Sequence, residues 1–435
     1  MIFKNKILGN VFSLGIVQMV NFIFPLVTIP YLSRIIGPSG YGIINYATSF
    51  VLYFIVLISY GFDYSATRQI VQSDQKVETL SLIFSKIIYA RIILFIVSIV
   101  IFIVAVFFIN KLNDNLTVSF AVFASTLATV LAPQYFLQGM QKLRPFAMIS
   151  FVRGLMSTIL IFILITSAND YIYVPVITSS VNIFASLLLI IFVVKNFNLK
   201  FKIIRLKTIL KLLWTDRILY FSNFVISLYT STNIVVLGFF ASVVEIGYLT
   251  VAQNFTLIVL AVIAMPIGMA IFPVIGSEFK ISQEKGILKF RKVLPIVFYI
   301  TFICSLILYF SSDLIISLVY GGQFKNSVYV LQVMAFVPFF ATLANLMGVQ
   351  VMINLNLDKL FLKATTISAF FGFGINLYLC NIYGYIGCAW AFLITEIGVL
   401  LIMIILLLKN KINVVIIDDF SITNTYRLCV EMLKR

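Results

Sequence analysis

The sequence predicts an all-α polytopic membrane protein with about twelve transmembrane helices. Hydrophobic residues make up 62% of the 435-residue chain, and charged residues make up only 11%. Apolar runs of about 20 residues, long enough to cross a bilayer as helices, recur along the whole length. The Lys and Arg residues gather in alternate connections between these runs, which is typical of a chain that crosses the membrane repeatedly.

The apolar runs define the expected helices. The first run begins at Val11 and has no small-residue cleavage site, so we interpret it as a membrane helix and not as a removed signal. A first set of six helices is predicted at 11–33, 41–62, 86–109, 117–137, 147–167 and 172–194. A second set is predicted at 218–240, 247–273, 293–311, 327–352, 364–382 and 388–408, with NIYGYIG as the break in its last pair.

The basic residues predict that both termini lie in the cytoplasm. Of the 31 Lys and Arg residues, all fall in connections on one side except Arg34, Lys111 and Lys325 on the other side and Arg91 and Arg153 inside helices. An excess of Lys and Arg marks cytoplasmic loops. Topology and attraction to anionic lipid headgroups therefore explain the net charge of +16, and nucleic acid is not an expected partner.

An internal repeat relates the two halves. YGIINYATSF (41–50) is similar to IGYLTVAQNF (246–255), and the alignment places Gly42 on Gly247 and Ala47 on Ala252. A weaker match pairs QKL at 141–143 with DKL at 358–360. Helices one and seven both begin on the cytoplasmic side, so the halves are predicted to be parallel repeats. Transporters built this way bind substrate where the halves face each other.

The repeat divides the chain into four predicted segments: a six-helix lobe over 1–195, a cytoplasmic basic amphipathic linker over 196–217, a second six-helix lobe over 218–409 and a cytoplasmic tail over 410–435. The linker has an apolar face at helical spacing, with lysines away from it: Ile203, Leu206, Leu210 and Leu213, against Lys200, Lys207 and Lys211. Such a helix is expected to lie in the membrane interface. A solvated loop is the alternative.

Several kinds of chemistry are not expected. The four cysteines show no spacing typical of a metal site or a disulfide framework, and the chain has no histidine. The usual zinc ligand and proton-transfer base are therefore missing. No nucleotide-binding glycine loop is visible, and the longest outer connection, SSDLIISLVYGGQFKNS, carries one carboxylate, Asp313. We therefore do not expect an enzyme, nor any metal or organic cofactor.

Uncharged polar residues in the helices are candidates for lining a substrate cavity. The face of the first helix carries Gln18, Asn21 and Thr28 at spacings of three and seven residues, which is too polar for lipid contact. The remaining candidates are Asn45 on the second helix, Asn223 and Asn233 on the seventh, and Gln253 and Asn254 on the eighth. Amides and hydroxyls suit sugar hydroxyls, which donate and accept hydrogen bonds. The alternative is that these groups hold helices together.

Charges inside the membrane form a second set of candidates. Arg153 lies about 10 Å beyond the start of its helix at 1.5 Å per residue, and could line the cavity or extend back to the headgroups. Glu396 lies near the middle of the last helix, where it is either a neutral hydrogen-bonded carboxyl or the site of a coupling cation, Na⁺ or H⁺. We expect Arg91 to extend to the interface and Asp63 to pair with Arg68.

Five stretches carry a resemblance to a known family. They are FPLVTIPYLSRIIGPSGYG (24–42), YGFDYSATRQI (60–70), LQGMQKLRPFAM (137–148), LDKLFLK (357–363) and YGYIGCAWAFLITE (383–396). The chain resembles the polysaccharide-repeat-unit flippases of the multidrug/oligosaccharidyl-lipid/polysaccharide exporter superfamily. The resemblance implies two six-helix lobes around a central cavity and a polyprenyl-diphosphate-linked sugar as substrate, as in O-antigen or capsule export. Tyr385 and Trp390 depart from the pattern, because small residues are commoner at those positions.

Arg34 is the candidate for the diphosphate. It follows the polar face of the first helix at the predicted outer boundary, beside a glycine-rich turn. An Arg side chain binds a phosphate in a bidentate way that Lys cannot match. The alternative is an interfacial anchor at the outer gate.

The resemblance also sets the expected setting of the protein. It implies a multi-pass protein of the bacterial cytoplasmic membrane whose partners are membrane lipids, a lipid-linked sugar and other membrane proteins of polysaccharide assembly. A multidrug exporter of the same fold, a membrane enzyme of the same pathway, and a transporter of teichoic-type or peptidoglycan precursors are the alternatives. A multidrug exporter would need carboxylates facing cationic drugs, and Glu396 is the one clear intramembrane acid.

Overall fold

The computed structural model describes the backbone of residues 2–421. Within that range it does not describe the side chains at 2–16, 18, 19, 21, 22, 222, 226, 228–231, 265, 269, 270, 272, 273 and 417. The described residues form helices joined by short connections and contain no strand. The prediction of an all-α chain is therefore confirmed.

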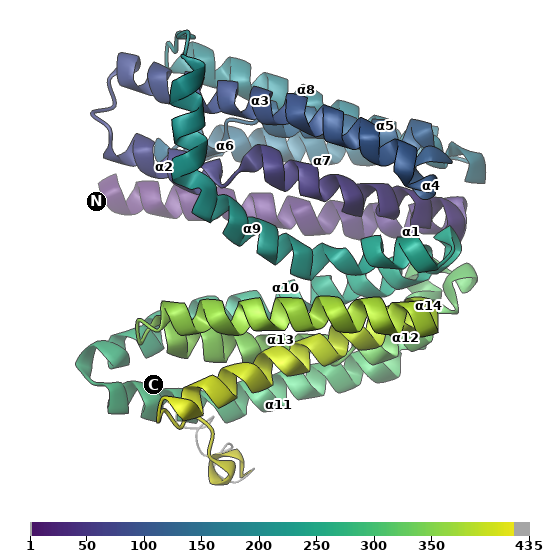
Figure 1. Cartoon of the computed structure of the whole chain (residues 1–435), viewed down its shortest axis with the longest axis vertical. Coiled ribbons are helices and arrows are strands. Elements are labelled where there is room, and N and C mark those ends of the chain that lie inside the picture. Colours follow the sequence, from purple (N-terminus) through teal and green to yellow (C-terminus); the bar gives the residue numbers. More distant parts are fainter. Residues whose placement is uncertain (1, 422–435) are drawn as a thin grey trace. The chain divides into compact units, whose positions relative to one another are not determined.

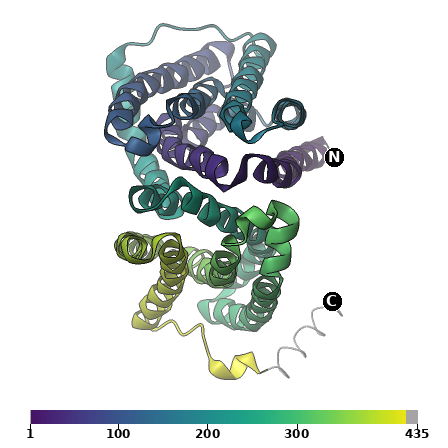
Figure 2. The same cartoon turned by 90° about the vertical axis from the view of Figure 1, so that its right-hand side faces the viewer.

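The chain divides into two compact units. Of the described residues, unit 1 holds 2–238 with 242–247 and 319–323, and unit 2 holds 239–241, 248–318 and 324–421. The long helices of each unit run beside one another (Figure 1), and Figure 2 looks nearly along their axes. The contacts of the seventh predicted helix therefore place nearly all of it in the same unit as the first six helices.

Unit 1 contains the following helices: α1 (Ile2–Ser59), α2 (Phe62–Gln72), α3 (Val77–Phe108), α4 (Asn110–Asn113), α5 (Leu116–Leu131), α6 (Gln134–Gly139), α7 (Arg144–Leu164), η1 (Ala168–Ile172), α8 (Tyr173–Asn196) and the first part of α9 (Leu206–Phe240). The strongest packing joins α5 with α8 and α1 with α7 and α5. Helix α3 begins at Val77, before its predicted start at 86, and the added turns bury Leu80, Ile83 and Phe84.

Helix α1 is two helices in one. Gly37 has φ 65° and ψ −178°, which breaks the helix between the predicted spans at 11–33 and 41–62. Only glycine adopts this region readily, and Pro38 follows at the start of the second half, where its missing N–H costs nothing. The proline- and glycine-rich stretch of the sequence is therefore a turn between two membrane helices.

The linker differs from the prediction. No helix covers 198–205; instead the N–H groups of Lys200 and Lys202 donate to Ser81 Oγ (3.0 Å) and Ser85 Oγ (2.9 Å) on α3. These bonds hold residues 200–202 extended along α3. In a helix these N–H groups would donate to carbonyls of the same helix instead. The helix begins at Leu206 and continues without interruption into the seventh membrane helix. The predicted apolar face is largely exposed, with Ile203 at 95% and Leu210 at 54%, as a membrane-interface segment requires.

Unit 2 contains α10 (Val243–Ile281), apart from its first turn, α11 (Gln283–Ile315), the π-helix η2 (Ile316–Tyr320) up to Leu318, η3 (Gly322–Phe324) from Phe324, α12 (Ser327–Met334), α13 (Val337–Asn345), the π-helix η4 (Leu346–Ile353), α14 (Asp358–Lys409) and η5 (Ile417–Phe420). Helix α14 is also broken, at Gly384 (φ 56°, ψ −135°), inside the NIYGYIG stretch that separates the last predicted pair.

The tail packs against unit 2. Arg291 on α11 makes two hydrogen bonds to the Asp419 carboxylate, at 2.6 and 3.1 Å. Tyr299 donates to the carbonyl of Phe420, and the ring of Phe420 lies 5.2 Å from that of Phe298. The described part of the tail is therefore docked on α11 and is not a free extension.

Nine helices among the described residues are long and apolar enough to cross a membrane. Two of them, Ile23–Gln72 and Asp358–Lys409, contain the glycine breaks and have the length of two spans each. The surfaces of these helices carry exposed large hydrophobic side chains such as Phe107 (75%) and Phe108 (82%), which favour lipid over water. The chain is a polytopic membrane protein, and the count of twelve helices stays a prediction.

Candidate functional site

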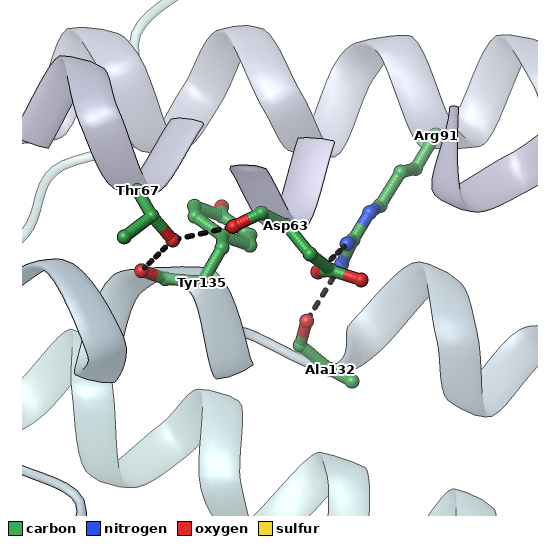
Figure 3. Close-up of polar contacts among 5 residues, drawn as sticks. All are labelled: Asp63, Thr67, Arg91, Ala132 and Tyr135. Carbon is green, nitrogen blue, oxygen red and sulfur yellow. Dashed lines mark hydrogen bonds and ion pairs between the residues drawn. The ribbon is translucent and has the colours of Figure 1, made fainter. Parts of the chain in front are cut away.

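A buried arginine lies at the centre of a polar network in unit 1 (Figure 3). Arg91 on α3 is 2% exposed. Its Nη1 donates to the carbonyl of Ala132 at 2.6 Å, and its Nη2 lies 3.2 Å from Asp63 Oδ1. Two predictions are therefore wrong: Arg91 does not extend to the interface, and Asp63 pairs with Arg91 and not with Arg68. The Ala132 carbonyl and the Asp63 carboxylate are partners for the two terminal nitrogens of Arg91 inside the protein, so its side chain need not reach water.

The same network supports the break between α5 and α6. Ala132 and Pro133 separate α5 from α6, and proline cannot continue the backbone hydrogen bonds of α5. Arg91 supplies a donor to the carbonyl left at this break. Thr67 Oγ1 donates to the carbonyls of Asp63 (2.6 Å) and Tyr135 (3.0 Å) (Figure 3). The network thus ties α2 and α3 to the α5–α6 break and has a structural role.

Unit 1 also contains a buried acid that was not recognised from the sequence. Asp216 on α9 is 3% exposed, and Ser65 Oγ on α2 donates to its Oδ2 at 2.6 Å. No ion pair involves Asp216 among the side chains that the structure describes. The TDR stretch appears cytoplasmic because Lys and Arg surround Asp216, and only the packing of α9 onto α2 buries it.

Aromatic side chains cover this acid. The rings of Tyr60 and Tyr220 stack at 4.7 Å with an angle of 4° between their planes. Gly61, between α1 and α2, leaves room for Leu219 of α9. We call Ser65, Asp216, Tyr60 and Tyr220 the Asp216 contact. It joins α9 to the break between α1 and α2.

Beyond the C-terminal end of α9, the first turn of α10 meets α1 in a different way. A Cβ on Gly42 would overlap the carbonyl oxygen of Val243, and a Cβ on Gly247 would overlap that of Pro38. These are the glycines that the internal repeat aligns, and Pro38 and Val243 also occupy equivalent positions. We call the four residues the glycine crossing.

Arg34 lies at the same end of unit 1. Its aliphatic carbons lie 3.4 to 4.0 Å from where a Cβ on Gly321 would be, and Gln323 Oε1 lies 2.8 Å from where a Cβ on Gly37 would be. The Arg34 side chain is exposed. It therefore lies over the 321–323 connection, which makes both earlier interpretations, a phosphate ligand and an outer-gate anchor, compatible with its place.

The connections predicted to lie outside gather at this end of unit 1. Gly40 packs against Tyr171, and Lys111 lies close enough to Glu245 for their charges to interact. Burial lowers the pKa of Lys111, and the charges of Glu245 and Asp114 act in the opposite direction. Connections that lie on the same side of the membrane must come together at one end of the helices, as these do.

The other predicted cavity residues of unit 1 divide into three groups. Thr28 is buried, and its hydroxyl donates to the carbonyl of Phe24 at 2.9 Å, while Asn45 Nδ2 donates to Tyr41 at 2.7 Å. Asn233 is buried, whereas Asn223 and Arg153 are half-buried. The side chains of Gln18 and Asn21 lie outside the described residues. Thr28 and Asn45 bond to carbonyls of their own helix, and their place in a substrate cavity stays a prediction.

Unit 2 holds the remaining candidates. Gln253 on α10 is 4% exposed and Asn254 is half-buried. Glu396 on the second half of α14 is 6% exposed. The structure therefore confirms that Glu396 is a buried acid and leaves its coupling role a prediction.

Gln350 is a further buried polar residue that sequence reasoning missed. It is 1% exposed, and its Nε2 donates to the carbonyl of Gly268 on α10 at 3.1 Å. Its Oε1 is buried without a hydrogen bond. Gln350 lies in the π-helix η4, and π-helical turns often occur at functional sites. The spacing of Asn345, Gln350 and Asn354 fits no α-helical face, so only the π geometry turns them together toward α10.

Two relatives are similar over nearly the whole chain. A protein of Escherichia coli (strain K12) named Putative O-antigen transporter is 27% identical over 411 residues, which cover 94% of this chain and 99% of that protein. A Putative O-antigen transporter of Shigella dysenteriae is 23% identical over 397 residues, which cover 91% and 98%.

Two solved structures have a similar fold. Lipid II flippase MurJ in an inward closed conformation gives a TM-score of 0.69 at 18% identity, over 96% of this chain and 92% of that one. An inward-facing multidrug resistance MATE family transporter of the MOP superfamily gives 0.61 at 12% identity, over 92% and 97%. The fold is thus that of transporters, and the named relatives are transporters and not enzymes.

The family model described as Polysaccharide biosynthesis protein matches residues 7–279, which is more than half of the chain. The match includes the glycine crossing, the Asp216 contact and the Arg91 network. The resemblance stated from the sequence is therefore confirmed, and the chain belongs to the polysaccharide biosynthesis protein family.

Proposed function

We propose that this protein flips a polyprenyl-diphosphate-linked oligosaccharide repeat unit from the inner to the outer leaflet of the cytoplasmic membrane by alternating access. Family membership, two relatives named as putative O-antigen transporters and a fold shared with a lipid II flippase support the proposal. Both termini would lie in the cytoplasm.

The position of Arg34 carries the proposal. An exposed guanidinium lies at one end of the membrane helices, above a connection whose glycine adds no side chain. A diphosphate carries at least two negative charges, and the planar guanidinium can donate two hydrogen bonds to it. Arg34 would hold the headgroup at the outer end of its path.

The buried polar groups agree with a sugar as the other part of the substrate. Among the described residues, the charged members of the buried set are Arg91, Asp216 and Glu396; the others are Ser, Thr, Asn and Gln. Arg91 already pairs with Asp63 and donates a hydrogen bond to the carbonyl of Ala132. An interior this poor in acids does not suit cationic drugs, so we place the multidrug exporter second, despite the shared fold. Glu396 would bind the coupling cation, Na⁺ or H⁺.

Reconstitution tests this function. Proteoliposomes carrying a fluorescent polyprenyl-diphosphate oligosaccharide are assayed with a membrane-impermeant quencher, with and without pH and Na⁺ gradients. We expect Arg34→Ala to weaken the apparent affinity about tenfold or more, the loss of a charge-assisted hydrogen bond. Arg34→Lys should recover only part, because an ammonium cannot donate the paired bonds.

Lys325→Ala, at another cation predicted to lie outside, is the matched control and should behave as wild type. An Arg34→Lys variant with wild-type affinity would remove the phosphate role and leave the anchor. A wild-type protein that flips no lipid-linked oligosaccharide under any gradient would refute the proposed function itself.

A further inference from the structure

Two cysteines face each other across the break in α14. Cys380 and Cys388 are both fully buried, and their sulfur atoms lie 2.8 Å apart. The sequence shows them only as residues eight apart in an apolar stretch, which on a continuous helix would place them about 12 Å apart along the axis. The structure therefore brings together two thiols whose spacing predicts no disulfide.

The fold of α14 explains the contact. After Gly384 the second half returns along the first, because Gly387 lies against the carbonyl of Leu379 and Gly372 lies against Thr395. In Figure 1 the yellow-green and yellow halves of α14 run out and back. Cys380 and Cys388 are opposite each other at the closed end of this hairpin, where the two backbones are nearest.

The sulfur separation is close to that of a bond. A disulfide has an S–S length of about 2.05 Å, and 2.8 Å is shorter than the contact distance of two unbonded sulfurs. Asn376 Oδ1 is 3.9 Å from Cys388 Sγ and is the polar neighbour on the facing half. A shift of less than an ångström would join the two sulfurs without moving either half of the hairpin.

The turn of the α14 hairpin lies near segments that are predicted to be on the outer side of the membrane. The ring of Tyr385 lies 5.7 Å from that of Tyr248, which in turn lies 6.3 Å from Phe324. Residues 241–248 and 320–324 are connections, or lie beside connections, that the distribution of basic residues places outside. The compartment outside the bacterial cytoplasmic membrane is oxidising and permits disulfides.

We propose that Cys380 and Cys388 form a disulfide that closes the α14 hairpin at its turn. The two thiols lose two protons and two electrons as the S–S bond forms. The acceptor is the disulfide of a thiol–disulfide oxidoreductase, which becomes a dithiol after passing through a mixed disulfide with one of the cysteines. Because both thiols are buried in the folded protein, the exchange takes place before the hairpin packs.

The bond would act on the half of the hairpin that carries Glu396. That residue lies two helical turns beyond Cys388 on the same half of α14. A disulfide at the turn fixes the register of the two halves and therefore the depth of Glu396 against the first half. This consequence rests on the predicted orientation and on the proposed coupling role, whereas the bond itself does not depend on transport.

Differential alkylation tests the bond. Membranes are denatured in N-ethylmaleimide, and the protein is then reduced, treated with an isotopically labelled maleimide and analysed by peptide mass spectrometry. We expect Cys304 to carry the first label, and Cys380 and Cys388 to carry only the second. First-label modification of both Cys380 and Cys388 in wild type would overturn the proposal.

Variants make the assignment specific. Cys380→Ser should transfer Cys388 to the first label, and Cys304→Ser, the matched control, should change neither. In a host without its extracytoplasmic disulfide oxidant, Cys380 and Cys388 should both carry the first label. Retention of the bond in that host would mean that another oxidant forms it, and would refute the proposed outer location of the turn.

A reductant should lower the unfolding temperature of wild type and leave that of a Cys380→Ala/Cys388→Ala variant unchanged. The flipping assay is separate, so failure of the bond leaves the transport proposal intact.

Discussion

The segment formed by α9 and the first turn of α10 is joined to the α1–α2 segment at two places that use opposite chemistry. At the glycine crossing, backbone lies directly on backbone, and a single added methyl group would overlap a carbonyl oxygen. At the Asp216 contact, on the N-terminal half of α9, a hydroxyl donates to a buried carboxylate, and the rings of Tyr60 and Tyr220 stack nearby.

The difference shows how the segment formed by α9 and the first turn of α10 can be held firmly at one end and conditionally at the other. The glycine crossing depends on shape alone, and no change of charge can alter it. The Asp216 contact depends on one hydrogen bond to an acid that has no ion-pair partner among the described residues. Burying such a group is costly, so this end should separate at lower cost.

The largest effect is expected at the glycine crossing. Gly42→Ala adds a methyl group where the Val243 carbonyl lies, and overpacking of a tight contact costs about 1–3 kcal/mol or more. We expect a lower unfolding temperature and a lower yield of monodisperse protein in detergent. Gly374→Ala is the control, because a Cβ there meets nothing within 4 Å. Equal behaviour of the two variants would mean that the crossing is not tight.

An effect no larger than that of Gly42→Ala is expected at Arg91, whose partner Asp63 lies on α2, as does Ser65 of the Asp216 contact. Arg91→Met leaves the Asp63 carboxylate and the Ala132 carbonyl without this donor. Removing one partner of a fully buried pair costs about 3–5 kcal/mol, but Asp63 is 45% exposed, so we expect about 1–3 kcal/mol. Hydrogen exchange should rise in α2 and at the α5–α6 break and stay unchanged at the glycine crossing. Arg68→Met is the control, and equal exchange in both variants would contradict the network.

The smallest effect is expected at the Asp216 contact. Ser65→Ala and Asp216→Leu each remove the hydrogen bond, while Asp216→Asn keeps an acceptor for the Ser65 hydroxyl. A double-mutant cycle with Ser65→Ala and Asp216→Leu should give a coupling of about 0.5–1.5 kcal/mol, the net worth of one hydrogen bond. Guanidinium unfolding followed through Trp214 measures it. A coupling of zero would show that the hydrogen bond does not stabilise the protein. If Asp216→Asn destabilised the protein as much as Asp216→Leu, the contact would need the charge of Asp216.

Much of the architecture could be predicted from local properties of the chain. Apolar runs, glycine–proline breaks and basic connections depend on nearest neighbours and on the bilayer, so the broken helix at Gly37 and the split near Gly384 were both expected. The matching of Gly42 with Gly247 was visible as a repeat, although nothing in the repeat indicated that the two glycines would touch.

The buried charges could not be assigned in the same way. A sequence shows which charges are near one another along the chain, and this made Arg68 the apparent partner of Asp63. The partner is Arg91, because α3 lies beside the α5–α6 break and supplies its donor there. Asp216 was hidden among cations, and the π-helical turn that orients Gln350 has no recognisable pattern in the sequence.

The sequence by itself determined that this chain lies in a membrane, that it is helical, where its breaks fall and which family it resembles, because hydropathy and turn chemistry act over a few residues. Only the tertiary structure decided which groups are paired: Arg91 with Asp63, Asp216 with Ser65, and Cys380 with Cys388. Hydrogen bonds and sulfur contacts act over about 3 Å, and only the packing of helices brings residues far apart in the chain within that distance.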